Sequence, residues 1–318
     1  MSGLDGTVLV TWSGFDPADD ATAGVLRAAG LDVRFAPRLQ ERSEEELVGL
    51  AHDAVAVIAD ADPFTADVIR QLPRLRVIAR VGVGLDSVDL VAARAAGIDV
   101  TTTPGHMEGT VADHTLALML AVVRRIVVFD RIVRGGEWIR VERAGDDLHG
   151  RTVGVVGLGA IGRVVCRRLS GFDVHLLGHD PVAGDLPHVE RVTFEELIDR
   201  SEIIVLNVPL TPATRGLISR DVIARMRPGA VLVNAARGHV VDEAALIAGL
   251  RSGHLGGAGL DVFAEEPAES SPLWTMDNVV LSPHIGGVSR RSIRDMTERA
   301  VQCTIASLHG EPTGVVNP

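Results

Sequence analysis

The chain has 318 residues and a formal net charge of −11, which disfavours nucleic acid and anionic membranes as partners because both attract basic surfaces. Lysine and tyrosine are both absent, which excludes Schiff-base chemistry, a P-loop lysine and the Tyr-x-x-x-Lys mechanism of short-chain dehydrogenases. With 46% hydrophobic residues, no apolar run long enough to cross a bilayer and no basic leader, the sequence predicts a cytoplasmic, globular protein of two domains.

Short β-branched runs alternate with amphipathic helical patterns over the first hundred residues. The predicted strands are residues 7–12, 31–36, 54–59, 76–81 and 98–103, and the predicted helices are residues 18–30, 43–51, 65–72 and 87–97. Each helical pattern begins with polar or capping residues. Such alternation predicts βαβ units and a parallel sheet.

Residues 110–136 are predicted to form one long helix that ends at a glycine pair. Its apolar residues are too dense for a surface helix, which indicates burial between domains or subunits. A second alternating series follows, with predicted strands at residues 151–156, 173–180, 202–209, 230–237, 256–263 and 278–284. A final helix at residues 289–310 could return to the first sheet. The fold class predicted is α/β, with two doubly wound parallel-sheet domains.

A glycine motif stands at the first junction of the second series. Gly157, Gly159 and Gly162 form a G-x-G-x-x-G pattern between a predicted strand and a predicted helix. The three glycines allow a tight turn, close approach of a pyrophosphate and close helix–strand packing. Asp180 ends the next strand, where a carboxylate accepts hydrogen bonds from a ribose 2′-OH and repels a 2′-phosphate. The motif therefore predicts binding of NAD. Cys166, in the helix after the motif, and Cys303 are interpreted as small buried residues, and no disulfide or metal site is predicted.

Polar residues end three later strands of the second series. Arg237, Asp261 and His284 follow predicted strands, and Glu265 and Glu266 follow Asp261 closely. The carboxyl ends of parallel strands line the ligand crevice of an α/β sheet. Histidine can carry a proton, a carboxylate can orient it, and a guanidinium can bind a substrate carboxylate. Taken singly, each residue also fits a surface ion pair, an acidic turn or an ordinary loop histidine.

Further motifs follow in order along the chain. They are RVGVGLDSVDL (80–90), TTPG (102–105), VADHTLALMLA (111–121), DLHGRTVGVVGLGAIGR (147–163), LNVPLTPATRGLI (206–218), NAARGHVVDEAAL (234–246), GLDVFAEEP (259–267), SPHIGG (282–287) and VVNP (315–318). Together they resemble the D-isomer-specific 2-hydroxyacid dehydrogenases, the group that includes the D-3-phosphoglycerate, glyoxylate/hydroxypyruvate and D-lactate dehydrogenases.

The resemblance implies roles for particular residues. Arg237 would bind the substrate carboxylate, His284 would be the acid/base, and Glu266, which directly precedes the proline, would be its partner. The implied cofactor-binding residues are Gly157, Gly159, Ala160, Ile161, Gly162, Asp180, Asn207, Val208, Pro209, Thr214, Ala235, Ala236, Arg237, Asp261, His284 and Gly286. The implied substrate-binding residues are Val81, Gly82, Val83 and Gly84, whose backbone N–H groups would form a nest, together with Arg237 and His284.

The family architecture implies a flavodoxin-like substrate-binding domain of residues 1–103 plus 286–318. A Rossmann NAD-binding domain of residues 104–285 would complete the chain, with the active site in a cleft between the two. The helix at residues 110–134 would be the interdomain and dimer element, so a homodimer is expected.

Some positions depart from the family pattern. Met107-Glu108 replaces a common Asn-Ser pair, and Asn207 stands where many relatives have histidine. Asp60 and Asp62 occupy the segment that carries an Arg-Ser-x-Thr-like sequence in phosphoglycerate enzymes, which disfavours a substrate phosphate. The identity of the 2-hydroxy acid and the physiological direction stay open.

The predicted function is an NAD-dependent oxidoreductase that interconverts a small D-2-hydroxy acid and its 2-oxo acid. An alternative of a different class is an NAD(H)-sensing, corepressor-like interaction protein of the same fold. A third reading, a formate or phosphite dehydrogenase, requires extra substrate-site residues that the sequence does not show.

Overall fold

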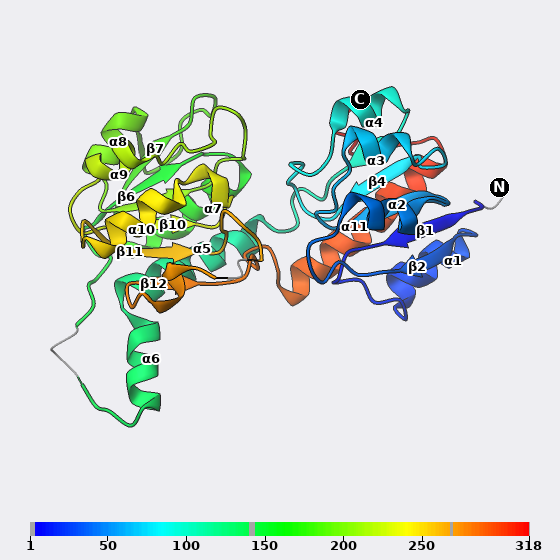
Figure 1. Ribbon diagram of the computed structural model, residues 1–318. Helices are drawn as coiled ribbons and strands as arrows, with labels where there is room; N and C mark the ends of the chain where they lie inside the picture. The colour runs from blue at the N-terminus through cyan, green and yellow to red at the C-terminus, as the bar shows by residue number, and fades with distance from the viewer. Residues whose placement is uncertain (1–3, 140–143, 268–269, 318) are drawn as a thin grey trace. The chain divides into compact units, whose positions relative to one another are not determined.

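The computed structural model describes residues 4–139, 144–267 and 270–317, and its chain divides into two compact units (Figure 1). One unit comprises Met1–Met107 with Val288–Pro318, and the other comprises Glu108–Gly287. These boundaries lie within four residues of the predicted domain boundaries at 103/104 and 285/286. Each unit contains one parallel sheet, as the α/β prediction requires.

The first unit has a five-stranded parallel sheet in the order β2-β1-β3-β4-β5. Its strands are β1 (Thr7–Val10), β2 (Asp32–Phe35), β3 (Ala54–Ala59), β4 (Val77–Arg80) and β5 (Asp99–Thr101). Its helices are a π-helical turn (Asp20–Gly24) that leads into α1 (Val25–Ala28), then α2 (Glu44–Ala51), α3 (Ala66–Arg70), α4 (Leu90–Ala95) and α11 (Arg290–Leu308). All five predicted strands are confirmed, and the strand order is that of flavodoxin-like folds.

Alternation along β1 explains why helices cover both faces of this sheet. Val8 and Val10 point into one hydrophobic cluster, and Leu9 points into the cluster on the other face. The final helix α11 supplies Met296 and Val301 to the first cluster and packs against β3 and β4. The end of the chain therefore completes the core of the unit that begins it.

The second unit has a seven-stranded parallel sheet in the order β12-β11-β10-β9-β6-β7-β8. Its strands are β6 (Thr152–Val156), β7 (His175–His179), β8 (Val189–Arg191), β9 (Ile203–Leu206), β10 (Ala230–Asn234), β11 (Leu255–Leu260) and β12 (Val279–Leu281). Besides α5 and α6, which are described below, its helices are α7 (Ala160–Leu169), α8 (Phe194–Arg200), α9 (Arg220–Arg225) and α10 (Glu243–Arg251). Short 3₁₀ turns occur at Ser170–Phe172, Gly238–Val240 and Pro272–Thr275. The strand order reverses between β6 and β9, as in a Rossmann fold, where ligands bind at the carboxyl ends of the strands. The three-residue edge strand β8 was not predicted.

The prediction of one long helix at residues 110–136 is wrong. The structure has α5 (Glu108–Val123) and α6 (Ile126–Arg134), separated by Arg125 in the left-handed conformation with φ of 54°. The carbonyl of Val123 accepts a hydrogen bond of 2.9 Å from the Asp146 N–H, so a returning loop takes the acceptor that a continuing helix would use. The apolar periodicity alone does not reveal this break.

The dense apolar surface of α5 is explained by packing within its own unit. The helix contacts β10, β11, β12 and α7, and Leu116, Leu118 and Met119 belong to a buried cluster on that face of the sheet. Cys166 is buried in the same cluster, and burial raises the pKa of its thiol to about 11. Among the described residues, no helix is both long enough and apolar enough to cross a membrane.

Candidate active site

The glycine motif forms a turn between β6 and α7. Gly157 has φ of 92°, which a side chain would strain, and a Cβ there would lie 2.6 Å from the carbonyl oxygen of Asn207. A Cβ on Gly162 would overlap the carbonyl oxygen of Gly157. A Cβ on Gly159, in contrast, would meet nothing within 4 Å. Two of the glycines are therefore needed to close the turn, and the third faces open space at the start of α7, where a phosphate can approach the helix N-terminus.

Asp180 lies directly after β7 and faces this turn. Its Oδ2 accepts a hydrogen bond of 2.8 Å from the Leu158 N–H, and its Oδ1 accepts hydrogen bonds from the N–H groups of Val182 and Ala183. Burial acts to raise the pKa of Asp180, but these three hydrogen bonds outweigh it, and the pKa lies below its ordinary value. An ionised carboxylate is thus fixed beside the glycine turn.

Further predicted cofactor residues of this unit follow strands β9 and β10. The backbone N–H of Asn207 donates to Val156, and among the described residues its buried side-chain nitrogen has no hydrogen-bond partner. Val208 and Pro209 come next, and the Thr214 hydroxyl donates to the Pro209 carbonyl at 2.6 Å. Ala235 and Ala236 follow β10. An open glycine turn, a fixed carboxylate and an unpartnered buried amide at adjacent strand ends fit a dinucleotide.

His284 and Glu266 form a close pair beyond β11 and β12. Nδ1 of His284 lies 2.5 Å from Oε2 of Glu266, and Oε1 of Glu266 accepts a hydrogen bond of 2.8 Å from the Phe263 N–H. Burial acts to raise the pKa of Glu266, but His284, the Phe263 N–H and the charge of Arg237 together hold that pKa below its ordinary value. Glu265, its neighbour, is exposed. The residue beside the proline, rather than Glu265, is therefore the partner of His284.

Arg237 lies on the loop after β10, within electrostatic range of Glu266. The Asn234 side chain donates to the Arg237 carbonyl at 3.0 Å, and the Arg237 guanidinium donates to the Ala236 carbonyl at 2.7 Å. The next residue, Gly238, passes so close to the Phe263 carbonyl that a Cβ would overlap it. This contact brings the loops after β10 and β11 together. The three predicted acid-base residues therefore share one region of one unit.

Asp261 directly follows β11 and is almost completely buried, with 1% of its surface exposed. Its Oδ1 accepts hydrogen bonds from the Ser282 hydroxyl at 2.7 Å and from the Ile285 N–H at 2.9 Å. Its Oδ2 accepts a hydrogen bond of 2.7 Å from the Gly286 N–H. These hydrogen bonds thus hold the loop that carries His284 against the Asp261 carboxylate. The predicted contact of Asp261 with the cofactor stays a prediction.

His114, on α5, is a residue of this network that the sequence reasoning missed. Its Nε2 lies 2.7 Å from the Ser282 hydroxyl and 3.3 Å from Oδ1 of Asp261. The sequence places it 168 residues before Ser282, within an apolar helical pattern. No spacing signal links positions so far apart, so only the fold could reveal the contact.

The predicted substrate segment, Val81 to Gly84, lies in the first unit, after β4. The Val81 N–H donates to the Ala59 carbonyl at 2.9 Å, and the Gly82 N–H donates to the Thr103 hydroxyl at 2.8 Å. Two of the four N–H groups are thus used inside the unit. Of the four N–H groups predicted to bind the substrate carboxylate, those of Val83 and Gly84 stay candidates.

The two aspartates after β3 differ in environment. Asp62 is completely buried, pairs with the Arg42 guanidinium at 2.7 Å and accepts a hydrogen bond from the Thr11 hydroxyl. Asp60 is partly buried, and its carboxylate accepts a hydrogen bond of 2.7 Å from the Ala61 N–H. The idea that both carboxylates repel a substrate phosphate therefore holds at most for Asp60, because the charge of Asp62 is compensated.

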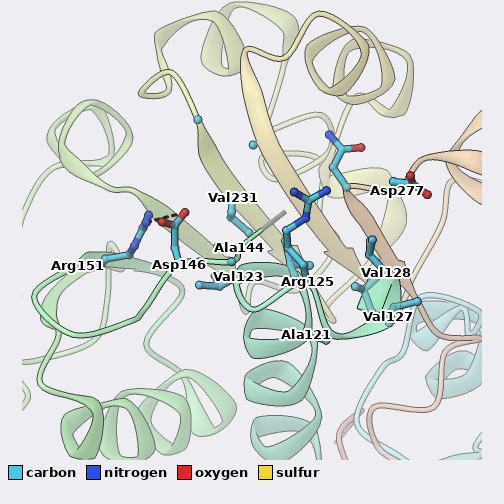
Figure 2. Close-up of a pocket in the computed structure, with 16 residues that line it drawn as sticks. Ala121, Val123, Arg125, Val127, Val128, Ala144, Asp146, Arg151, Val231 and Asp277 are labelled. Carbon is cyan, nitrogen blue, oxygen red and sulfur yellow. Dashed lines mark ion pairs between the residues drawn. The ribbon is translucent and has the colours of Figure 1, made fainter. Parts of the chain in front are cut away.

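A pocket of about 290 Å³ lies at the opposite ends of the strands, and no sequence motif pointed to it (Figure 2). It is lined by Gly229, Gly256 and Asn278, which precede or begin β10, β11 and β12, and by the α5–α6 junction. Figure 2 shows Arg125 extending into it, and the ion pair of Asp146 with Arg151, at 3.1 Å, lies on one side. Since ligands of such sheets bind at the carboxyl ends, this pocket is separate from the cofactor region.

Comparison with known proteins identifies the family. The model described as "D-isomer specific 2-hydroxyacid dehydrogenase, NAD binding domain" matches residues 116–286. A glyoxylate reductase of Thermofilum pendens is 40% identical over 287 residues, which cover 86% of this chain and 85% of that protein. The chain belongs to the D-isomer-specific 2-hydroxyacid dehydrogenase family. Its second unit is the NAD-binding domain of this family.

Other relatives differ in length. A D-3-phosphoglycerate dehydrogenase of Mycobacterium leprae is 42% identical over 234 residues, which cover 72% of this chain and 44% of that protein. This chain thus matches less than half of that relative. The crystal structure of the TT0316 protein from Thermus thermophilus is similar over nearly the whole chain, with a TM-score of 0.90, 40% identity and coverage of 98% of this chain and 99% of that one.

Proposed function

We propose that this protein is an NAD-dependent dehydrogenase that interconverts a small D-2-hydroxy acid and its 2-oxo acid. The observation that carries the proposal is the 2.5 Å pair of His284 and Glu266, with Arg237 within electrostatic range of the same carboxylate, on the loops after β10 to β12. These loops lie at the carboxyl ends of the sheet that contains the glycine turn. An acid/base, its orienting carboxylate and an anion-binding guanidinium are what this reaction needs from the protein.

The hydrogen-bond pattern supports a particular role for each group in the proposal. Glu266 is ionised near neutral pH because its pKa is lowered, so it can only accept, and Nδ1 of His284 donates to it. Nε2 of His284 is then the atom that exchanges a proton with the substrate oxygen. Arg237 binds the substrate carboxylate, whose negative charge matches its guanidinium. Bound NAD would accept or deliver the hydride at the substrate carbon.

The cofactor is proposed to lie along the carboxyl ends of the strands, from the glycine turn after β6 toward the loop after β12. Gly159 and the start of α7 would receive the pyrophosphate, and Asp180 would accept hydrogen bonds from the adenosine ribose. The substrate role of Val83 and Gly84, in the other unit, is retained as a proposal from the family resemblance. Because Asp60 follows β3 in place of a basic residue, a substrate with an uncharged side chain, such as glyoxylate or pyruvate, is favoured over a phosphorylated one.

The direct test is NADH oxidation with glyoxylate, hydroxypyruvate, pyruvate and 2-oxoglutarate, with NADPH in parallel. We expect turnover on at least one of these acids with NADH and weaker turnover with NADPH, because Asp180 repels a 2′-phosphate. A marked preference for NADPH would contradict the role of Asp180. Binding of NADH without turnover on any 2-oxo acid would favour the interaction-protein alternative, which the names of the relatives do not favour.

We also propose that the protein is a homodimer joined through α6. In Figure 1 this helix extends away from the sheet of its unit, and its apolar residues Ile126, Val127 and Val133 are exposed. Trp138, in the segment after it, is 75% exposed. A helix that exposes this much apolar surface is typical of a subunit interface. Light scattering should give a dimer mass for the wild type and a smaller mass for Val133→Glu, and a monomeric wild type would refute the proposal.

A further inference from the structure

The strongest unassigned feature is the chain of polar groups that joins α5 to the loop of His284. The imidazole of His114 lies 2.7 Å from the Ser282 hydroxyl, which lies 2.7 Å from the Asp261 carboxylate. The side chain of His114 is only 22% exposed. A histidine on α5, a serine after β12 and an aspartate after β11, all in the same unit, thus form one series of hydrogen-bonded side chains.

The number of hydrogens in this chain fixes its direction. An ionised aspartate has no hydrogen to donate, so the single hydroxyl hydrogen of Ser282 goes to Oδ1 of Asp261. The Ser282 oxygen must then accept from its other neighbour. Nε2 of His114 therefore carries a hydrogen and donates it to Ser282, whatever the charge of the ring. The 3.3 Å approach of the same nitrogen to Asp261 agrees with this, because two acceptors face one donor.

Asp261, at one end of this series of hydrogen-bonded side chains, holds the backbone around His284 in a strained conformation. His284 has φ of 54°, a left-handed conformation that is strained for a non-glycine residue. Its N–H donates to the Asp261 carbonyl at 2.7 Å, and the next two N–H groups donate to the Asp261 carboxylate. A Cβ on Gly286 would lie 2.7 Å from Oδ2 of Asp261, so the loop can reach the carboxylate only with glycine there.

We propose that His114 is a positioning residue for His284, which acts by holding Ser282 and Asp261 in the one hydrogen-bonding arrangement that fixes the loop of residues 282–286. This inference rests on the proposed function for its catalytic consequence. The geometry that carries it, however, lies within one unit and can be tested without any substrate. His114 supplies no proton to the reaction. It sets where the imidazole of His284 stands.

The substrate-free test is ¹⁵N NMR of the full-length protein labelled at histidine nitrogens, with the His114 signals assigned by their loss in His114→Gln. We expect Nε2 of His114 to carry a hydrogen at neutral pH, because the Ser282 oxygen can only accept from it. We also expect His114→Leu to shift the His284 signals. The exposed residue His149 offers a matched control, and His149→Leu should leave the His284 signals unchanged. A neutral His114 ring with hydrogen on Nδ1 alone would overturn the inference.

The kinetic test separates positioning from folding and from cofactor binding. We expect His114→Leu and Ser282→Ala to lower kcat by about 10–100-fold, since a displaced catalytic group costs that much. The Kd of NADH should rise by a much smaller factor, because the glycine turn and Asp180, which would bind the other end of the cofactor, are not touched by these variants. His114→Gln keeps an N–H donor and should restore most of kcat. Equal activity of the Leu and Gln variants would overturn the inference. A wild type inactive on every 2-oxo acid would refute the proposed function and leave the NMR test standing.

Discussion

Each unit buries one aspartate just beyond the carboxyl end of a parallel strand, but the two carboxylates are held by different kinds of partner. Asp62, after β3, is paired with the Arg42 guanidinium and the Thr11 hydroxyl. Asp261, after β11, accepts instead from the N–H groups of Ile285 and Gly286 and from Ser282. The same residue type at the same kind of position therefore serves two purposes.

The difference lies in what each carboxylate holds in place. The ion pair of Asp62 connects to the loop before α2, because Arg42 also donates to the carbonyls of Ala36 and Pro37. Asp261 holds a loop whose central residue, His284, leaves its imidazole about half exposed. A buried ion pair, such as that of Asp62 with Arg42, has a structural role in its unit. A buried carboxylate that accepts hydrogen bonds from a loop backbone, as Asp261 does, can instead position a reactive side chain on that loop. Variants of the two sites should separate these effects.

The largest expected effect is on catalysis at the Asp261 site. His284→Asn should lower kcat on the best 2-oxo acid by about 10²–10⁴-fold, because the proton carrier is lost. Its thermal unfolding midpoint should stay close to that of the wild type. Steady-state kinetics and calorimetry measure both quantities. Near-normal turnover of this variant would remove His284 from the mechanism.

The next largest effect is on stability at the Asp62 site. Arg42→Met leaves a buried carboxylate uncompensated and should cost about 3–5 kcal/mol of unfolding free energy. The double variant Arg42→Met with Asp62→Asn should recover part of this loss, since no charge remains buried alone. Urea unfolding followed by tryptophan fluorescence reports on this unit, because Trp12 is buried in it while Trp138 and Trp274 are exposed. A single variant as stable as the wild type would contradict the structural role.

The glycine turn allows a sharper comparison between two adjacent positions. Gly162→Ala forces a Cβ against the Gly157 carbonyl and should cost about 1–3 kcal/mol of stability. Gly159→Ala meets no atom within 4 Å, so its stability should be unchanged while its affinity for NADH falls. Thermal unfolding and NADH fluorescence titration distinguish the two. Unchanged NADH affinity in Gly159→Ala would argue against phosphate approach at that residue.

The smallest effect is the pH dependence contributed by Glu266. Its pKa is lowered from 4.5 in the folded protein, so its contribution to stability is fully present above about 4.5 and is lost as the pH falls through the folded-state pKa. The difference in unfolding midpoint between wild type and Glu266→Gln should therefore shrink on acidification below 4.5. Glu265→Gln, at the exposed neighbour, is the control and should show no such change. A difference that grows at low pH would have the wrong sign.

Much of the chemistry was visible in the sequence because it depends on local features. The β-branched runs predicted eleven of the twelve strands found in the described part of the chain, and the spacing of Gly157, Gly159 and Gly162 predicted the turn between β6 and α7. The proline after Glu266 distinguished it from Glu265 through the family motif, and the structure pairs Glu266 with His284. Such features can be detected in the sequence because each depends on residues only a few positions apart.

The tertiary structure decided what no short stretch contains. Sequence patterns alone were enough to predict the two parallel sheets, the family and the residue types available for proton transfer and anion binding. Only the fold decided that the apolar run after residue 107 breaks at Arg125, that Arg42 neutralises Asp62, and that His114 reaches Ser282. The physical reason is that strand ends and helix faces become neighbours only after the sheet has assembled, and the partner of a buried polar group is fixed by that assembly rather than by distance along the chain.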